Sequence, residues 1–246
     1  MSIKKHIPNI VTLGNLFCGT LATIFAVGGH FEMTALFVAL GIFLDFFDGF
    51  FARILNVSGE LGKQLDSLAD MVTSGVVPGI VLFVLLGNNQ QIPYEIDSEF
   101  KFSMGLPLLG LFITLSACYR LAKFNLDTRQ SESFIGLPTP AMSLFIVSLP
   151  LVQMHSDVDF VKDLIGNNYF LIGIAILFSF LMNSELSLFS LKFKNYGIKE
   201  NLFKYILITL SIVLIVAFEY LSVPIIIMSY ILLSILNNFK NTDIKN

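Results

Sequence analysis

The stretch DFFDGFFARILNVSGELGKQLDSLAD, residues 45–70, decides how this chain must fold. It contains four aspartates in or beside segments that are otherwise apolar enough to enter a lipid bilayer: Asp45, Asp48, Asp66 and Asp70. An ionised carboxylate near the centre of a membrane helix costs about 2.5–3.5 kcal/mol. Because four such costs cannot stand uncompensated, the folded protein must hold these side chains in a specific site, and a metal site is the simplest explanation.

The composition of the whole chain is that of a membrane protein. Hydrophobic residues make up 55% of the 246 residues and charged residues 13%, with a mean hydropathy of +0.78. A soluble domain carries about 25% charged residues. The sequence has no CxxC pair and no cluster of histidine and cysteine, which argues against a disulfide framework or a zinc site.

Apolar runs of about 20 residues, the length that spans a bilayer, recur along the chain. We expect spanning helices near residues 9–29, 33–54, 66–87, 104–124, 138–155, 168–184, 203–220 and 222–238. The predicted fold is therefore an all-α polytopic membrane protein, a bundle of about eight transmembrane helices. Residues 1–200 would form a six-helix catalytic membrane domain, and residues 201–246 a C-terminal helix pair with a short cytoplasmic tail.

The basic residues predict the orientation of this bundle. With eight spans, thirteen of them fall on one side: Lys4, Lys5, Arg53, Lys63, Arg120, Lys123, Arg129, Lys192, Lys194, Lys199, Lys204, Lys240 and Lys245. The other side receives only Lys101 and Lys162. Because loops rich in Lys and Arg stay in the cytoplasm, we expect a multi-pass protein of the cytoplasmic (inner) membrane with the aspartates at the cytoplasmic face.

The spacing of the aspartates predicts a metal site. The first two are three residues apart and the last two four apart, so on a helix each pair shares one face. Gly59 and Gly62 interrupt the helical pattern in NVSGELG, residues 56–62, so the helices should run antiparallel and face their carboxylates together. Four carboxylates without His or Cys suit Mg²⁺, Mn²⁺ or Ca²⁺. Their charge would balance two ions, the usual arrangement for phosphoryl transfer.

Small residues and one arginine beside the acids predict a diphosphate site. Gly49 and Ala52 would let a ligand approach the helix backbone, and Arg53 can bind a phosphate with two parallel hydrogen bonds. One alternative is a set of buried ion pairs with Arg53 and Lys63, but two cations cannot neutralise four acids. Another is a divalent-cation transporter, which would need acids along a path across the membrane, but mid-span acids are absent from the fourth to eighth spans apart from Glu185 near a boundary.

The pattern D-x2-DG-x2-AR-x8-G-x3-D-x3-D resembles the signature of the CDP-alcohol phosphatidyltransferase family. It is filled at every position, by Asp45, Asp48, Gly49, Ala52, Arg53, Gly62, Asp66 and Asp70. The resemblance implies a helical membrane enzyme that displaces CMP from a CDP-linked lipid with an alcohol. It also implies that the first three aspartates bind the metals and phosphates, that Asp70 completes the metal site and acts as the base, and that the chain forms a homodimer.

Four other stretches indicate the acceptor alcohol. Residues 8–19, 120–125, 134–141 and, more loosely, 181–194 resemble segments of membrane-embedded bacterial phosphatidylserine synthases. This resemblance implies CDP-diacylglycerol and L-serine as substrates, with Mg²⁺ or Mn²⁺ as cofactor and no nucleic-acid partner. Glycerol 3-phosphate, inositol or an aminoalcohol remains open as the acceptor, and an intramembrane prenyltransferase would also use paired aspartates.

Two further pairs of polar residues are candidates for substrate contacts. Thr12 and Asn15 are one turn apart in the first span and could bind the cytosine or ribose, or make an interhelical hydrogen bond instead. Arg120 and Lys123 share a helix face at the cytoplasmic end of the fourth span. They could bind the serine carboxylate or only anchor the helix at the membrane surface. Residues 136–140, with two prolines, should form a wall of the pocket.

Overall fold

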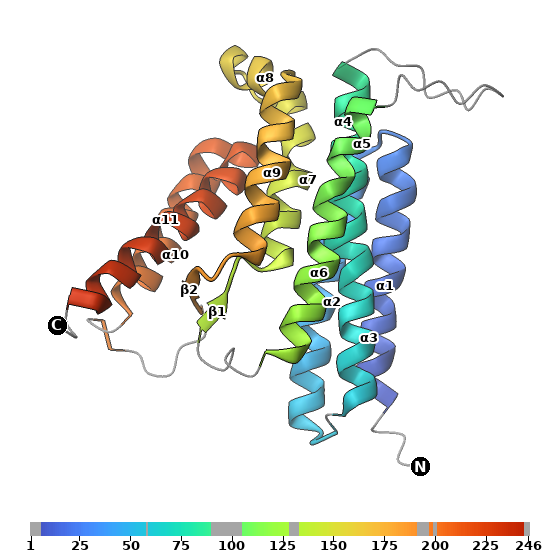
Figure 1. The fold of residues 1–246 in the computed structure, drawn as a ribbon, viewed down its shortest axis with the longest axis vertical. Helices are drawn as coiled ribbons and strands as arrows, with labels where there is room; N and C mark the ends of the chain where they lie inside the picture. Colours follow the sequence, from blue (N-terminus) through green and yellow to red (C-terminus); the bar gives the residue numbers. More distant parts are fainter. Residues whose placement is uncertain are drawn as a thin grey trace.

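The chain folds as a bundle of long helices with one short pair of strands (Figure 1). The computed structural model describes residues 6–57, 59–89, 105–127, 133–190, 197–198 and 201–243. The helical elements are α1 (His6–Val27), α2 (Phe31–Ile54), α3 (Glu60–Asp70), η2 (Met71–Val76), α4 (Val77–Asn89), α5 (Gly105–Leu108), η4 (Leu109–Leu111), α6 (Phe112–Leu126), α7 (Thr139–His155), α8 (Asp159–Ile165), α9 (Asn168–Asn183), α10 (Leu202–Phe218), η5 (Glu219–Leu221) and α11 (Ser222–Asp243). The strands are β1 (Ser133–Ile135) and β2 (Ser187–Phe189).

Each of the eight predicted spans is a helix in the structure, which confirms an all-α polytopic membrane protein. In the described part of the chain, five helical stretches are long and apolar enough to cross a membrane, or six if the bent pair α8–α9 is one span. Helix α7 is a shorter apolar helix of 17 residues. Helices α10 and α11 reverse direction at η5, where Glu219 has a positive φ of 45°, and run back side by side (Figure 1).

The turn between α2 and α3 brings the first two aspartates back toward the last two. Two residues after the end of α2, Asn56 lies in the left-handed region, at φ 51°. The N–H groups of Asn56 and Val57 donate to the carbonyls of Arg53 and Ala52, at 3.2 and 3.0 Å, which is the Schellman arrangement. The turn is shorter than predicted, because α3 already begins at Glu60 and its first turn contains Gly62.

The helix that follows Asp70 passes through a π-helical turn, η2. The proline at position 78 has no N–H and leaves the carbonyl of Ser74 without its usual α-helical donor. The ladder shifts by one residue here, since the N–H of Val77 donates to the carbonyl of Val72. Such π-turns are frequent at functional sites, and this one adjoins the last aspartate.

Small residues let α1 and α2 approach η2 closely. A methyl group added to Gly19 on α1 would lie 2.9 Å from the backbone N and Cα of Thr73. One added to Gly41 on α2 would lie 2.8 Å from Cγ2 of the same threonine. Contacts of this kind replace the hydrophobic effect as the cause of helix association in lipid.

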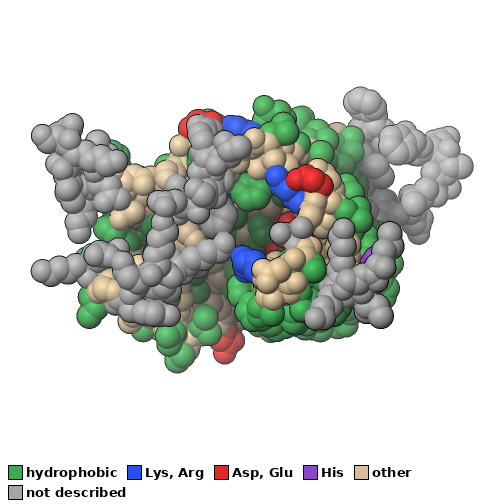
Figure 2. All heavy atoms as spheres, turned by 90° about the horizontal axis from the view of Figure 1, so that it is seen from below, with side chains coloured by type: hydrophobic (Ala, Val, Ile, Leu, Met, Phe, Trp, Pro, Cys, Tyr) green, Lys and Arg blue, Asp and Glu red, His purple; other side chains and the backbone are tan. Residues whose placement is uncertain are grey.

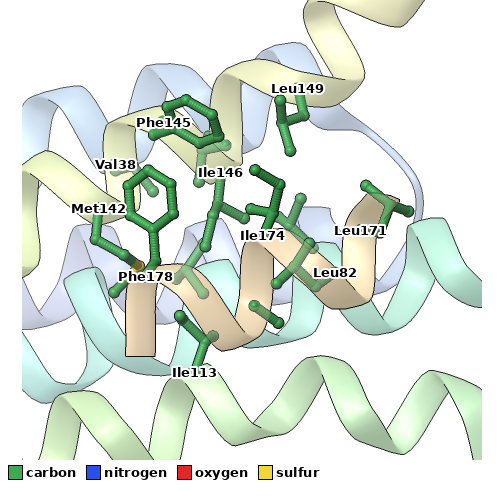
Figure 3. Close-up of a cluster of buried hydrophobic side chains, with 14 of the residues drawn as sticks. Val38, Leu82, Ile113, Met142, Phe145, Ile146, Leu149, Leu171, Ile174 and Phe178 are labelled. Atoms are coloured by element: carbon green, nitrogen blue, oxygen red, sulfur yellow. The ribbon is translucent and has the colours of Figure 1, made fainter. Parts of the chain in front are cut away.

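The apolar core lies between α2, α4, α6, α7 and α9. Figure 3 shows side chains from these helices meeting in one cluster, among them Val38, Leu82, Ile113, Ile146 and Phe178, all with no exposed surface. Large apolar side chains also cover the outside of the bundle, including Phe17, Phe46, Ile176 and Val216. An apolar exterior is the surface that a lipid bilayer solvates.

The two strands are the one element type that the sequence prediction lacked. They pair antiparallel, with Phe134 opposite Leu188 and Ile135 opposite Ser187. The turn after β1 depends on Gly136, whose φ is +75°. Its N–H donates to the carbonyl of Leu186 at 2.8 Å, which attaches the start of α7 to the segment after α9.

The arrangement of the helix ends fits the predicted two-sided topology. The start of α1, the end of α2, the strand pair and the end of α11 all lie in the lower half of Figure 1. Several basic residues used for the orientation lie outside the described residues: Lys4, Lys5, Lys101, Arg129, Lys192, Lys194, Lys199 and Lys245. The side of the membrane on which this end lies therefore stays a prediction.

Replacing Gly136 by Ala should destabilise the protein. The left-handed backbone alone costs an L-residue about 1–2 kcal/mol, and the added Cβ would lie 2.3 Å from the carbonyl oxygen of Met182. We expect a lower melting temperature of the purified protein in detergent. Gly173→Ala is the matched control, because its Cβ would meet no atom within 4 Å; equal melting temperatures for the two variants would contradict this account.

Candidate active site

Three carboxylates from two antiparallel helices meet at one end of the bundle. Oxygen atoms of Asp45 and Asp48 on α2 and of Asp66 on α3 all lie within 4.8 Å of one another. The fourth carboxylate, Asp70, lies near enough to Asp45 and Asp66 to interact with them electrostatically. The structure thus brings together all four aspartates of the sequence prediction. Figure 2 looks onto this end of the molecule and shows Lys and Arg side chains around a hollow with acidic atoms at its base.

Helix α1 supplies hydrogen-bond donors to the acids. The hydroxyl of Thr12, which is buried, donates to Oδ2 of Asp48 at 2.5 Å. The amide Nδ2 of Asn15, also buried, donates to Oδ1 of Asp70 at 3.2 Å. Of the two interpretations open for this pair, the hydrogen bonds between helices are the ones that the structure contains.

A residue that the sequence analysis missed orients Asn15. The hydroxyl of Thr73 donates to Oδ1 of Asn15 at 2.7 Å, so the other end of this amide must present its N–H groups to Asp70. Thr73 lies in η2, three positions after Asp70, and this helical spacing was an available signal. The hydrogen bonds therefore run in one chain from the Thr73 hydroxyl through the Asn15 amide to the Asp70 carboxylate.

Two cavities meet at the acid cluster. The larger, of about 520 Å³, lies between α2, α3, α6 and the start of α7. All four aspartates, Arg53 and Arg120 line it, together with apolar residues that include Phe46, Leu121, Phe124, Pro138 and Pro140. The two prolines confirm the predicted wall. The smaller, of about 220 Å³, is lined by Asn9, Thr12, Asp48, Gly49, Ala52, Gly59, Gly62, Lys63 and Asp66, among others.

Two glycines, one of them in the motif, leave space beside the acids. Gly49 lines both cavities, and a methyl group added to it would meet no atom within 4 Å. The same holds for Gly59 at the start of α3. Neither glycine is needed for close packing of helices, because no atom lies where its side chain would be. The lack of a side chain at Gly49 instead leaves room for a ligand against the backbone of α2.

Arg120 reaches the larger cavity and is held by backbone carbonyls. Its Nη1 donates to the carbonyls of Ile135 and Met182, at 2.8 and 3.0 Å, and its Nη2 to that of Gly136 at 3.2 Å. The guanidinium has five N–H donors, so two remain for a ligand. Three stretches that the sequence analysis singled out, 120–125, 134–141 and 181–194, therefore converge on this side chain.

Lys123 does not follow Arg120 into the cavity. Its Nζ forms an ion pair with Oε1 of Glu185 at 2.9 Å, and it is not among the residues that line either cavity. The two cations predicted to share a face therefore point to different partners.

The cluster of aspartates fits a hard divalent cation. Ligand oxygens on opposite sides of such an ion are about 4–5 Å apart, which agrees with the spacing of the three carboxylates. A donor set of oxygen alone suits Mg²⁺, Mn²⁺ or Ca²⁺ and does not suit zinc or copper. Asp70, beside this group, could share a second ion with it.

Comparisons with known proteins agree with the geometry. The family model described as CDP-alcohol phosphatidyltransferase matches residues 5–181. The chain is 35% identical over 149 residues to CDP-diacylglycerol–serine O-phosphatidyltransferase of Bacillus subtilis (strain 168), covering 59% of this chain and 75% of that protein. It is 32% identical over 219 residues to the Helicobacter pylori (strain J99) protein of the same name, covering 88% and 84%. Archaetidylserine synthase of Methanothermobacter thermautotrophicus is 27% identical over 61% of this chain and 60% of its own.

Divalent cations should stabilise this protein through the aspartates. A ligand at 100 times its dissociation constant stabilises a folded protein by about 2.7 kcal/mol, so Mg²⁺ or Mn²⁺ added after chelator treatment should raise the melting temperature. Asp66→Asn should abolish this rise, and without cations it should melt no lower than the unmodified protein, because one repelling charge is gone. Asp163→Asn on α8 is the control, and an unchanged cation response in Asp66→Asn would refute the site.

Proposed function

Because this chain belongs to the CDP-alcohol phosphatidyltransferase family, we propose that it transfers the phosphatidyl group of CDP-diacylglycerol to L-serine, releasing CMP and phosphatidylserine. The observation that carries this proposal is a cluster of carboxylates shared by two cavities of different character. A substrate with a nucleotide at one end, a lipid at the other and a diphosphate between them requires this arrangement.

The smaller cavity suits the nucleotide end of the substrate. Its polar groups include Asn9, Thr12 and Lys63. Gly59 and Gly62 line it without side chains that would fill the space. Lys63 is anchored here, because its Nζ donates to the carbonyl of Asn125 on α6 at 2.7 Å. We assign CMP to this cavity, with Ala52 beside the sugar phosphate.

The larger cavity suits the lipid phosphate and the acceptor. Phe46, Leu121 and Phe124 give it apolar walls on which a diacylglycerol can lie, while Arg53 and Arg120 supply positive charge. Gly49 lines both cavities, so we place the diphosphate across it, with Arg53 bound to a phosphate oxygen. The bond that breaks then lies beside the aspartates.

We assign two divalent ions, Mg²⁺ or Mn²⁺, to Asp45, Asp48, Asp66 and Asp70. When bound, the ions would neutralise the diphosphate and stabilise the charge that develops on the departing CMP. The protein's own contribution is orientation. The hydroxyl of Thr12 donates to Oδ2 of Asp48 and so fixes the orientation of this carboxylate.

Asp70 is the proposed base. The serine hydroxyl oxygen attacks the lipid-side phosphorus, its proton passes to the Asp70 carboxylate, and the bond from phosphorus to the CMP oxygen breaks with the electron pair leaving on CMP. Asn15 and Thr73 hold the carboxylate in place by the line of hydrogen bonds described above. A carboxylate beside cations is a weak base, so its effect depends on proximity more than on basicity.

Arg120 is the proposed partner of the serine carboxylate. It lines the larger cavity together with the aspartates, with two N–H donors left for an anion. Lys123, paired with Glu185, would act on serine only from outside the cavity. Glycerol 3-phosphate would bring a doubly charged phosphate in addition to those of CDP-diacylglycerol. It would therefore require more positive side chains than Arg53 and Arg120, which line this cavity.

We place the site at the cytoplasmic face of the cell membrane, on the basis of the excess of basic residues that the sequence predicts on its side of the bilayer, and propose a homodimer as the family resemblance implies. CDP-diacylglycerol would enter from the bilayer, and serine and CMP would exchange with the cytoplasm.

The acceptor and the base can be tested in one assay. Release of CMP from CDP-diacylglycerol by the purified protein should depend on serine and not on glycerol 3-phosphate or inositol. Asp70→Asn should lower turnover by about 10²–10⁴-fold, the contribution of a general base. Its amide can still accept a hydrogen bond from Asn15, so an unchanged melting temperature is the control. Near-normal turnover of Asp70→Asn would refute the role of Asp70 as the base. CMP release that occurs with another alcohol but not with serine would refute serine as the acceptor.

Substituting Gly49 tests the place of the diphosphate. Gly49→Ala adds a methyl group that meets no protein atom, so the fold should be unaffected. The methyl group enters the space assigned to the substrate, and overpacking costs typically 1–3 kcal/mol, so the KM for CDP-diacylglycerol should rise about tenfold or more. Gly173→Ala again serves as the matched control. An unchanged KM for the lipid would place the diphosphate elsewhere.

A further inference from the structure

The last helix of the chain holds strand β2 from behind. The hydroxyl of Tyr230 donates to the carbonyl of Phe189 at 3.1 Å, and the Phe189 ring meets the tyrosine ring edge-on, with centroids 5.3 Å apart. Two turns further along α11, Nδ2 of Asn238 donates to the carbonyl of Ser187 at 2.6 Å. Helix α11 is therefore bonded to the first and the last residue of the strand.

Strand β2 passes this restraint on to the arginine in the larger cavity. Ser187 is the partner of Ile135 in the antiparallel pair, and the N–H of Gly136 donates to the carbonyl of Leu186. The carbonyls of Ile135 and Gly136 are two of the three that hold Arg120. A pair of three-residue strands is too short to be stable alone, so its position depends on what packs against it.

We propose that α11 is a positioning element of the active site, in which Tyr230 and Asn238 act through Arg120 on the binding of the acceptor. The inference rests on the proposed role of Arg120 and adds to it residues outside the stretch 5–181 that matches the family. Tyr230 is buried, and its side chain lies near enough to Arg120 to interact with it electrostatically.

The physical reason is the small number of donors that Arg120 has left. Three of its N–H groups are directed by backbone carbonyls, and the direction of the other two follows from the plane that these three bonds impose. If β1 shifts, the carbonyls of Ile135 and Gly136 move and the guanidinium of Arg120 turns with them. Its two remaining N–H groups then no longer point at the carboxylate of the bound serine. Hydrogen bonds weaken steeply when donor and acceptor are misaligned, so the affinity for the serine carboxylate should fall.

The test is the double variant Tyr230→Phe with Asn238→Ala in the full-length protein. Loss of two neutral hydrogen bonds behind β2 should raise the KM for serine about tenfold. The KM for CDP-diacylglycerol should stay unchanged, since the lipid binds on α2 and α3, and kcat at saturating serine should be retained. When Asn238→Gln replaces Asn238→Ala in the double variant, the amide donor is kept, so the affinity for serine should be higher than with Asn238→Ala.

Ser234→Ala is the matched control. Ser234 is buried on the same face of α11, four residues from both Tyr230 and Asn238, but its hydroxyl donates only to the carbonyl of Tyr230 in its own helix. Its KM for serine should equal that of the unmodified protein.

A double-mutant cycle with Arg120→Lys separates this inference from the proposed function. Lys keeps the charge but not the planar set of donors, so the variant should raise the KM for serine by itself. If Tyr230 and Asn238 act through Arg120, their substitution should add nothing in the Arg120→Lys background. Full additivity, an unchanged serine KM in the double variant, or a parallel loss of kcat and both affinities would overturn the inference. An unchanged serine KM in Arg120→Lys alone would instead overturn the proposed role of Arg120.

Discussion

Repulsion among four carboxylates gathered at one end of an apolar helix bundle is the constraint on which the site depends. Like charges a few ångströms apart interact strongly where water is scarce. The structure meets this with donors from α1, because Thr12 and Asn15 bond to Asp48 and Asp70. The close approach of α1 at Gly19 makes these bonds possible. Neutral donors reduce the cost of burial without cancelling the charge, and this leaves a site that attracts cations.

Arg120, which lines the same cavity as the aspartates, has partners of the reverse kind. A buried guanidinium paired with a carboxylate would form a neutral unit with little attraction for a further anion. Arg120 is held by three carbonyl dipoles, which satisfy its donors and leave its net charge in place. The larger cavity therefore offers carboxylates to a cation and a charged guanidinium to an anion, as the proposed reaction would need.

The sequence predicted the helices and the acids well because both leave local signals. Apolar runs about 20 residues long and pairs of acids at helical spacing can be recognised without knowing the fold. The partners of Arg120 leave no such signal, since they are backbone carbonyls 15 to 62 residues away in the chain. The two strands were missed for the same reason, because three residues are too few for an alternating pattern. Lys123 shares the helix face of Arg120, yet Glu185 decides where it points.

Sequence alone determined that this chain is a polytopic membrane protein, and it predicted a site for divalent cations and a diphosphate, because composition, spacing and residue type carry that information. Only the tertiary structure decided what surrounds the motif. It divided the space beside the acids into two cavities, made Thr73 the residue that orients Asn15, and brought α11 behind the strands that hold Arg120. These are contacts between distant segments, and close packing of the helices determines which of them form.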